Sequence, residues 1–342
     1  MKTSLHHLRG PILRSVSRSF YLSLRLLPAP LREPISLAYL LARATDTIAD
    51  TPELATELRI QSLRTLASAI QAATPREAVV ELASAISLLQ ENEAERGLIE
   101  ALPAAIAWLE SLPERDRIEV RDLLQKINGG QTLDLERFGD RSRTLSLRSA
   151  FDLNEYTYLV AGCVGEFWTR LCFIHEKNFS DRPESELLEL GVEYGKGLQL
   201  INILRDAGSD LRQGRCYFPQ EELYSLGLKP EELLAHPRHA EPILRKWREK
   251  AEHGIAAGID YACSIRPRRL RFATALPALI GARTLALLRK AGPGIFTTKL
   301  KVPRPEIRQI IFRSAFRLAS PLSLRETFAR LSQELPRTPY KK

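Results

Sequence analysis

The sequence lacks the features that mark several classes of protein. No apolar run reaches the ~18 residues that a membrane-spanning helix needs; the best candidate, 272–282, contains Pro277 and is followed by Arg283. The N-terminus has no apolar core of the kind found in secretory signals. The four cysteines form no C-x-x-C pair and are too few for a disulfide framework. We therefore expect a cytoplasmic protein with reduced thiols and no transmembrane segment.

Strand patterns, zinc motifs and nucleotide-binding glycine motifs are also missing. Alternation of β-branched residues is scarce, and the six histidines show no zinc-binding spacing. The G-x-G formed by Gly195 and Gly197 has no third glycine and no preceding strand. These two absences argue against a Rossmann nucleotide-binding fold.

Helical periodicity is what the sequence has in abundance. Ala, Leu, Glu and Arg dominate, and Pro and Gly fall between the periodic segments. The pattern predicts helices at 11–26, 34–50, 53–73, 76–90, 94–111, 114–130, 151–176, 184–213, 220–226, 239–264, 269–291 and 304–318. No internal repeat or shift in composition marks a boundary, so we expect residues 1–342 to form a single all-α domain.

The net positive charge is concentrated in the segment 299–342. The chain carries a formal net charge of +9, and this segment has eleven Lys or Arg against three acidic residues. Ile307, Ile311 and Ala315 recur there at helical spacing. A basic amphipathic helix favours peripheral contact with an anionic membrane; a terminal helix with a solvated basic face is the alternative. No interleaved aromatics or known motif supports binding to nucleic acid.

A first polar stripe interrupts an apolar helix that is predicted to start at Pro34. At 100° per residue, Tyr39, Arg43, Asp46 and Asp50 fall within about 60° of one another. Two like charges one turn apart destabilise a helix slightly, and buried carboxylates need a partner or a cation. Mg²⁺ binds one or two carboxylates together with water and phosphate oxygens. The stripe therefore indicates a magnesium site; a surface ion pair of Arg43 with either aspartate is the alternative.

A second polar stripe lies in the segment 194–219. Asn202, Asp206 and Asp210 follow one another at intervals of four residues, and Gln199 lies on the adjoining edge. These side chains offer hard oxygen donors, and nearby arginines add cations that suit phosphate. A polar helix surface is the alternative for this stripe taken alone. Two such stripes in one chain predict carboxylates that face each other across a helical cavity, with magnesium and a diphosphate between them.

The segments that contain these residues resemble the squalene/phytoene synthase family. The matching segments are SRSFYLSLRLLP (17–28), YLLARATDTIAD (39–50), YTYLVAGCVGEFW (156–168) and QLINILRDAGSDLRQGRCYFP (199–219), with a weaker match in ALPALIGARTL (275–285). They extend over most of residues 11–301 in the order and spacing of the family. The resemblance implies an all-α bundle of the isoprenoid-synthase type around a central cavity. It also implies two prenyl diphosphate substrates and Mg²⁺ held by two aspartate-rich motifs.

The resemblance assigns roles to individual residues. The implied magnesium ligands are Asp46, Asp50, Asn202, Asp206 and Asp210. The implied contacts to diphosphate or substrate are Ser17, Arg18, Ser19, Tyr39, Arg43, Gln199, Arg205 and Arg215. Tyr39, Arg43 and Tyr156 are the implied catalytic residues. The phenol of Tyr156 would stabilise a carbocation through its ring face or pass a proton to the departing diphosphate; a packed helical aromatic is the alternative.

One position departs from the family pattern. Eukaryotic squalene synthases carry an additional acid just before the second Asp of the first motif, where this chain has Ala49. Many phytoene synthases place acids beside the aspartates of this motif, whereas this chain has Thr47 and Thr51. The number of metal sites on this helix is therefore open.

The resemblance also implies a product. The strings VAGCVGEFW and DTIAD are most similar to the squalene branch as found in bacteria. We therefore expect farnesyl diphosphate as substrate, presqualene diphosphate as intermediate and squalene, a sterol, hopanoid or carotenoid precursor, as product. The cofactors would be Mg²⁺, with Mn²⁺ as a substitute, and NADPH. Lys299 and Lys301 lie where that branch places cations for the nicotinamide phosphates; a solvated basic tail is the alternative.

Two kinds of alternative function are open at this point. The same scaffold could make phytoene or dehydrosqualene, or stop at presqualene diphosphate or a hydroxylated C30 product. A protein of another class, a basic helical scaffold at a membrane surface, would need no catalysis and no magnesium. Dependence of turnover on Mg²⁺ and Asp206 separates an enzyme from a scaffold.

Overall fold

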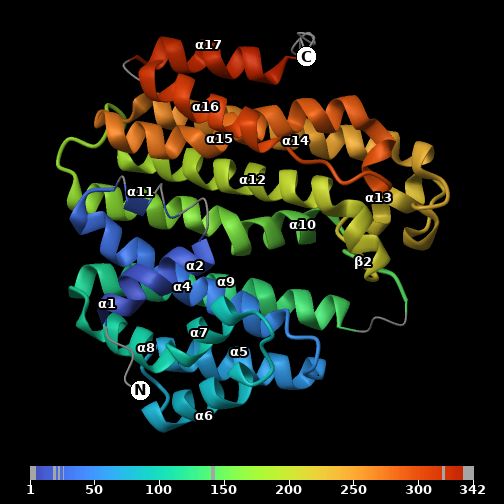
Figure 1. Cartoon of the computed structure of the whole chain (residues 1–342). Coiled ribbons are helices and arrows are strands. Elements are labelled where there is room, and N and C mark those ends of the chain that lie inside the picture. Colours follow the sequence, from blue (N-terminus) through green and yellow to red (C-terminus); the bar gives the residue numbers. More distant parts are fainter. Residues whose placement is uncertain are drawn as a thin grey trace. The chain divides into compact units, whose positions relative to one another are not determined.

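The computed structural model describes residues 5–17, 21, 24–25, 27–139, 143–317 and 320–333, without the side chains of 316 and 317. These residues are almost entirely helical (Figure 1), which confirms the predicted all-α class. The chain divides into two compact units. Unit 1 comprises Met1–Gly139 and Phe167–Lys177, and unit 2 comprises Asp140–Glu166 and Asn178–Lys342. That the whole chain forms one domain stays a prediction, as does the central cavity.

Unit 1 is a set of helices built around the long helices α4 and α9. Its elements are α1 (Leu5–His7), the π-helical turn η1 (Leu8–Ile12), α2 (Leu13–Ser17), α4 (Ala29–Ala49), α5 (Thr56–Ile70), α6 (Arg76–Ser87), α7 (Glu93–Glu100), α8 (Leu102–Ser111) and α9 (Glu114–Phe138). The later part of α11 (Cys163–His175) also belongs to this unit.

Helix α4 forms the centre of the unit 1 core. It packs against α9, α5 and α8, and Leu37, Leu40 and Leu41 on it are completely buried. Burial of such side chains supplies roughly 1.5–3 kcal/mol each. The expected start of this helix at Pro34 is wrong, because α4 begins at Ala29 and Pro34 lies inside it. The helix tolerates Pro34 at the loss of one main-chain hydrogen bond near its N-terminal end.

Unit 2 contains the remaining helices and a small parallel strand pair. Its elements are β1 (Leu145–Ser146), α10 (Ala150–Thr157), the π-helical turn η2 (Tyr158–Gly162), the start of α11, α12 (Glu184–Arg212), β2 (Arg215–Cys216), α13 (Gln220–Ser225), the 3₁₀ turns η3 (Pro230–Glu232) and η4 (Pro237–Ala240), α14 (Glu241–Ser264), α15 (Arg268–Ala291), η5 (Gly292–Phe296), α16 (Arg304–Arg317) and α17 (Pro321–Ser332). The strands pair Leu145 with Arg215 and Ser146 with Cys216.

Helices α12, α14 and α15 run beside one another and form the core of unit 2 (Figure 1). Glycines allow α12 to lie very close to α14 and to the turn η2. A Cβ atom on Gly197 would lie only 2.8 Å from the Cα of Gly254 on α14, and one on Gly195 would lie 2.2 Å from the carbonyl oxygen of Ala161. The G-x-G of the sequence therefore serves helix packing, because neither position has room for a side chain.

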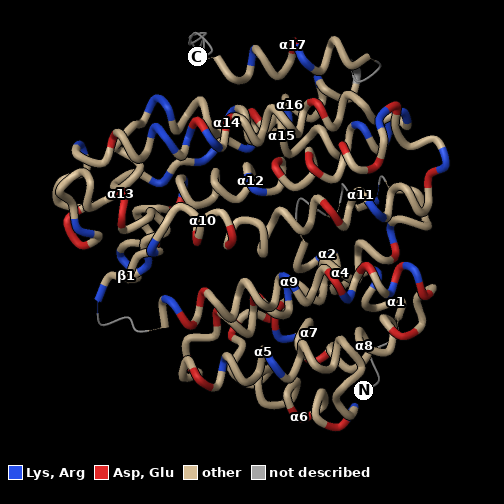
Figure 2. Tube along the Cα trace, turned by 180° about the vertical axis from the view of Figure 1, so that it is seen from behind, with Lys and Arg blue, Asp and Glu red and all other residues tan. Residues whose placement is uncertain are grey.

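Helix α15 and the C-terminal helices have the apolar and basic residues that matter for the predicted membrane contact. The stretch Arg268–Phe296 is the one helix among the described residues that is long and apolar enough to cross a membrane, and 61% of its most apolar part is buried. Core helices of soluble proteins have the same properties. Lys and Arg positions recur along α14 and the C-terminal helices (Figure 2). Phe312 on α16 and Leu322 on α17 are largely exposed.

Two further predicted helices differ from those observed, and one observed helix was not predicted. The helix expected at 94–111 is divided between α7 and α8 at Ala101, because Pro103 has no N–H with which to continue the hydrogen-bond ladder. The helix expected at 151–176 contains the π-helical turn η2. Helix α17 was not predicted, although Ser320 caps its first turn with a hydrogen bond from the Ser323 amide.

Candidate functional site

The polar stripe on α4 is the exposed face of an otherwise buried helix. Between 34 and 48, only Tyr39, Ala42, Arg43 and Asp46 are accessible to solvent. Asp50 follows as the residue that caps the C-terminal end of α4, and it is exposed. We call Tyr39, Arg43, Asp46 and Asp50 the α4 stripe. The structure thus brings the four predicted side chains together on one surface of unit 1.

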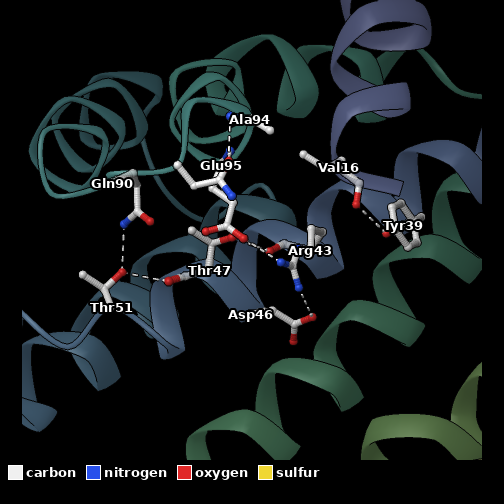
Figure 3. Close-up of polar contacts among 10 residues, drawn as sticks. Val16, Tyr39, Arg43, Asp46, Thr47, Thr51, Gln90, Ala94 and Glu95 are labelled. Atoms are coloured by element: carbon white, nitrogen blue, oxygen red, sulfur yellow. Dashed lines mark hydrogen bonds and ion pairs between the residues drawn. The ribbon is translucent and has the colours of Figure 1, made fainter. Parts of the chain in front are cut away.

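Arg43 has its main partner outside the α4 stripe. Its Nη2 atom lies 2.6 Å from Oε1 of Glu95 on α7, whereas its Nη1 atom lies 3.9 Å from Oδ2 of Asp46 (Figure 3). The Nε atom of Arg43 is buried without a partner among the described residues. Glu95 therefore takes up most of the positive charge of Arg43, and the simple surface pair with Asp46 accounts for little of this arrangement.

Asp46 is held by a neutral donor. The side-chain amide of Gln131 on α9 donates a short hydrogen bond to Oδ1 of Asp46. Partial burial raises the pKa of Asp46 from 3.8 to about 6, with Arg43 opposing the rise, Asp50 adding to it, and the hydrogen bond from Gln131 lowering it. The side chain is nevertheless 49% exposed, so it is recessed among its neighbours and still open to solvent. Such a carboxylate favours a cation as a further partner.

The position of Asp50 adds to the negative potential at this end of α4. Its main-chain amide donates to the carbonyl oxygen of Asp46 at 2.9 Å, so it closes the last turn. The C-terminal end of a helix carries a partial negative charge, and an acidic residue there is unfavourable without a cation. The α4 stripe therefore offers two carboxylates, one turn apart, that have chemistry suited to a divalent ion.

The remaining N-terminal residues of the predicted site are close to α4 or fall outside the structure. The hydroxyl of Tyr39 donates to the carbonyl oxygen of Val16 at 3.1 Å (Figure 3). Ser17 is buried and its hydroxyl donates to the carbonyl oxygen of Leu13, so contact with a substrate would require that bond to open. Arg18 and Ser19 lie outside the described residues.

The second stripe lies on α12, on the side away from the unit 2 core. Gln199, Asn202, Asp206 and Asp210 are all at least partly exposed, whereas Leu200, Ile201, Ile203 and Leu204 between them are buried. We call these four polar residues the α12 stripe. The Asn202 amide donates to Oε1 of Gln199 at 3.3 Å. The predicted clustering of these oxygen donors on one helical face is therefore observed.

Arginines accompany both aspartates of the α12 stripe, closely at Asp206 and at longer range at Asp210. Two nitrogens of Arg205 donate to the two carboxylate oxygens of Asp206, at 3.1 and 2.5 Å. Nη2 of Arg215 lies 3.7 Å from Oδ1 of Asp210 and donates to the side chain of Gln213 at 2.8 Å. Guanidinium groups of this kind bind phosphate oxygens in the same forked geometry.

A narrow recess beside Asp210 also contains Arg215 and Tyr217. The β1–β2 pair holds the chain here, since Arg215 and Cys216 form β2. The ring of Tyr217 stacks on that of Tyr156 from α10, with centroids 5.0 Å apart and planes at 24°. Their hydroxyl oxygens are 3.5 Å apart. The structure thus joins the predicted catalytic tyrosine to the end of the α12 stripe within unit 2.

The two lysines predicted to contact the nicotinamide phosphates are solvent-exposed. Lys299 and Lys301 lie in the connection between η5 and α16. Their exposure fits either a cation site or a solvated basic segment, so the role of these lysines stays a prediction.

The oxygen donors of both stripes fit a magnesium ion that is held by only a few protein ligands. Each stripe presents two carboxylates one helical turn apart. No group of three or more His, Cys, Asp or Glu that could enclose a metal occurs in the part of the chain that the structure describes. Mg²⁺ is usually held by one or two carboxylates and completed by water and phosphate oxygens, so these pairs suit a metal that arrives with a diphosphate.

Three residues of this site were not predicted from the sequence. Glu95 and Gln131 reach the α4 stripe from α7 and α9, and periodicity along α4 contains no information about them. Tyr217 could have been noticed, because it stands two residues after Arg215 in the matching segment GRCYFP. A lone polar residue on a distant helix gives no comparable signal.

Comparisons with known proteins extend over most of the chain. A sequence profile of the family described as Squalene/phytoene synthase matches residues 13–306. The squalene synthase of Schizosaccharomyces pombe is 24% identical over 306 residues, which are 89% of this chain and 64% of that protein. The bifunctional lycopene cyclase/phytoene synthase of Phaeosphaeria nodorum is 30% identical over 244 residues, which are 70% of this chain and 38% of that protein. The chain thus spans less than two thirds of the length of either relative.

A solved structure agrees with this assignment at the level of the fold. The complex of TcSQS with the ligand E5700 superimposes with a TM-score of 0.75 at 20% identity, covering 96% of this chain and 89% of that one. Since the profile alone accounts for well over half of the residues, the chain belongs to the squalene/phytoene synthase family.

Proposed function

We propose that this chain joins two molecules of farnesyl diphosphate head to head into presqualene diphosphate, and then reduces and rearranges this intermediate to squalene with NADPH. Membership of the squalene/phytoene synthase family supports the condensation. The relative from Schizosaccharomyces pombe, which is named squalene synthase, supports the choice of product. The relative from Phaeosphaeria nodorum, named for phytoene synthesis, makes phytoene the main alternative product.

The observation that carries the proposal is the placement of the carboxylates. Asp46 and Asp50 occupy the accessible face of α4, and Asp206 and Asp210 occupy the accessible face of α12. A scaffold protein has no need for two carboxylates placed so close that the charge of Asp50 adds to the raised pKa of Asp46. We propose that Asp46, Asp50, Asn202, Asp206 and Asp210 hold Mg²⁺, or Mn²⁺ in its place.

The residues around these carboxylates would perform the remaining steps. Magnesium, when bound, neutralises the charge that develops on a departing diphosphate. Arg205 and Arg215 would turn their guanidinium groups from the aspartates to the diphosphate oxygens. Gln199 would donate to the same group. Further contacts to the diphosphate are proposed for Ser17, Arg18, Ser19, Tyr39 and Arg43.

Tyr156 is the proposed residue for handling the carbocation. Its ring face can stabilise a positive charge, and its hydroxyl can carry a proton toward the leaving group. Stacking on Tyr217 fixes the plane of the ring, which a residue with this role requires. Lys299 and Lys301 are the proposed cations for the phosphates of NADPH.

The location of the protein follows as part of the same proposal. We place it in the cytoplasm, in peripheral contact with an anionic membrane through the basic segment 299–342. Exposed Phe312 and Leu322 beside basic residues support such contact. A substrate and a product with long apolar chains make this location chemically sensible.

The experiment that tests the function is a product analysis. The purified chain is incubated with labelled farnesyl or geranylgeranyl diphosphate and Mg²⁺, with and without NADPH, and the products are identified by mass spectrometry. Squalene that forms only with NADPH supports the proposal in full. Phytoene from geranylgeranyl diphosphate, without any C30 product, would move the chain to the phytoene branch. No product from either substrate would favour the non-enzymatic membrane scaffold.

A further inference from the structure

We propose that Gln131 is a positioning residue of the α4 stripe, which fixes the carboxylate of Asp46 for a divalent cation that arrives with a diphosphate. This inference rests on the proposed function and deepens it. Gln131 lies on α9, far from the aspartate-rich segments in sequence, and reaches Asp46 because α9 packs against α4 within unit 1.

The contact between the two side chains has a defined direction. The amide nitrogen of Gln131 donates to Oδ1 of Asp46, while Oδ2 is the atom nearest to Arg43, at 3.9 Å. The opposite orientation of the amide would place its carbonyl oxygen against a carboxylate, which is repulsive. Because the acceptor is charged, the bond is stronger than one between neutral groups. It leaves Oδ2 as the oxygen available to a cation.

The burial of Gln131 indicates that this contact has a cost in stability. Gln131 is only 9% exposed, and its side-chain carbonyl oxygen has no hydrogen-bond partner among the residues that the structure describes. A buried polar atom without a partner destabilises a folded protein, and such an atom calls for an explanation. Packing does not explain it, because an apolar side chain of the same length would fill this place without the unpaired oxygen.

The neutral character of Gln131 explains why an amide suits the position. A lysine or arginine here would neutralise Asp46 and compete with an incoming metal, as a nearby cation does. Arg43, the cation next to Asp46 on the same helix, is drawn away by Glu95 at 2.6 Å. Gln131 can thus orient the carboxylate while leaving its negative charge available for a cation.

A pair of matched substitutions tests this role. Gln131→Met removes the donor and the unpaired oxygen at nearly constant volume. Gln90→Met is the control, because Gln90 is also a buried glutamine of unit 1, 7% exposed, but donates to the hydroxyl of Thr51 at 2.9 Å instead of a carboxylate. Binding of Mn²⁺ to the full chain is measured by electron paramagnetic resonance in the presence of inorganic pyrophosphate, and melting temperatures are measured in EDTA.

The positioning role predicts weaker metal binding without any loss of stability. Loss of a residue that orients a metal ligand weakens metal binding by about 10- to 100-fold, so we expect at least a tenfold loss for Gln131→Met and less than a twofold change for Gln90→Met. The melting temperature of Gln131→Met in EDTA should stay unchanged or rise. A purely structural role predicts the reverse, namely a lower melting temperature with unchanged Mn²⁺ affinity.

The outcomes also separate this inference from the proposed function. If the wild type binds Mn²⁺ and turns over farnesyl diphosphate while Gln131→Met binds Mn²⁺ equally well, the role of Gln131 is overturned and the function stands. If the wild type makes no prenyl product yet Gln131→Met still loses Mn²⁺ affinity, the role of Gln131 stands and the reaction is wrong. A wild type that binds no Mn²⁺ with pyrophosphate overturns both.

Discussion

The α4 and α12 stripes carry the same kind of carboxylate pair but hold it in different ways. On α12, Arg205 donates hydrogen bonds to both carboxylate oxygens of Asp206, and Arg215 lies 3.7 Å from Asp210. On α4, the amide of Gln131 is the close partner of Asp46, and the neighbouring arginine is engaged by Glu95. Asp206 is therefore neutralised by a guanidinium, whereas Asp46 keeps most of its negative charge.

This difference leads us to expect that the two stripes bind metal under different conditions. A cation can join the α4 stripe without displacing another positive group, which suits a site that binds metal first. At the α12 stripe, a metal bound to Asp206 would replace the guanidinium of Arg205, which would then be available for phosphate oxygens. We therefore expect the α12 stripe to bind metal well only when a diphosphate is present to receive the arginines.

The largest effect is expected from breaking the α12 stripe itself. Asp206→Asn removes a proposed metal ligand, so turnover of labelled farnesyl diphosphate with Mg²⁺ should fall by more than about a hundredfold. The melting temperature in EDTA should change little, because a partly exposed ion pair contributes at most about 1 kcal/mol.

The matched control is Asp181→Asn, which also removes an ion-paired aspartate of unit 2. Asp181 is exposed and pairs with Arg266. This variant should retain full turnover. If Asp206→Asn remains as active as Asp181→Asn, the α12 stripe has no part in catalysis.

The next largest effect is expected from removing the partner that holds Arg43 away from Asp46. Glu95→Gln removes the carboxylate that now holds Arg43, so the guanidinium should move closer to Asp46 and neutralise it. We expect Mn²⁺ binding in the presence of pyrophosphate to weaken by about tenfold. Glu93→Gln, which removes an exposed carboxylate from the same turn of α7, should bind Mn²⁺ like the wild type. Equal affinities for the two variants would contradict the contrast drawn between the stripes.

A smaller effect is expected at the stacked tyrosines beside the α12 stripe. An aromatic pair of this geometry contributes about 1 kcal/mol, so Tyr217→Leu should lower turnover by about fivefold through loss of the fixed ring of Tyr156. Tyr217→Phe keeps the ring, and 3.5 Å is too long for a strong bond between hydroxyls. It should therefore retain more than half of the turnover.

Tyr224→Leu serves as the control for this pair, because Tyr224 is an exposed tyrosine on α13 of the same unit. A loss of turnover in Tyr217→Phe as large as that in Tyr217→Leu would show that the hydroxyl matters more than the stack. Kinetic measurements at saturating substrate distinguish these results.

The smallest effect concerns stability without metal. The pKa of Asp46 is about 6 in the folded chain against 3.8 as reference, so folding favours the protonated form. The contribution of this group to stability is complete below about pH 3.8 and is lost as the pH rises through 6. Asp46→Asn does not ionise and avoids that loss. In EDTA at pH 8 it should melt above the wild type, and the difference should vanish near pH 4.

The expected size of that difference is modest, because the Asp46 side chain is half-exposed and solvent screens it. We expect less than about 1 kcal/mol, which corresponds to about 1–2 °C in the melting temperature. Differential scanning calorimetry across this pH range provides the measurement. A wild type that gains stability relative to Asp46→Asn between pH 5 and pH 8 would contradict a raised pKa.

Much of the fold and part of the site could be predicted from the sequence. The all-α class and most helix positions follow from apolar periodicity, which acts over a few residues. The two stripes follow from the same geometry, since residues three or four apart share a face of a helix. The predicted start of α4 and the predicted single helix at 94–111 were wrong, because a helix tolerates or excludes proline according to its local position.

The sequence by itself determined which side chains line each helix, and hence which carboxylates lie next to each other. Only the tertiary structure decided that Gln131 and Glu95, from α9 and α7, would complete the surroundings of the α4 stripe. The same holds for Tyr217, which stacks on Tyr156 although 61 residues separate them. The physical reason is that helical periodicity fixes neighbours within one helix, whereas contacts between helices depend on how whole faces pack together.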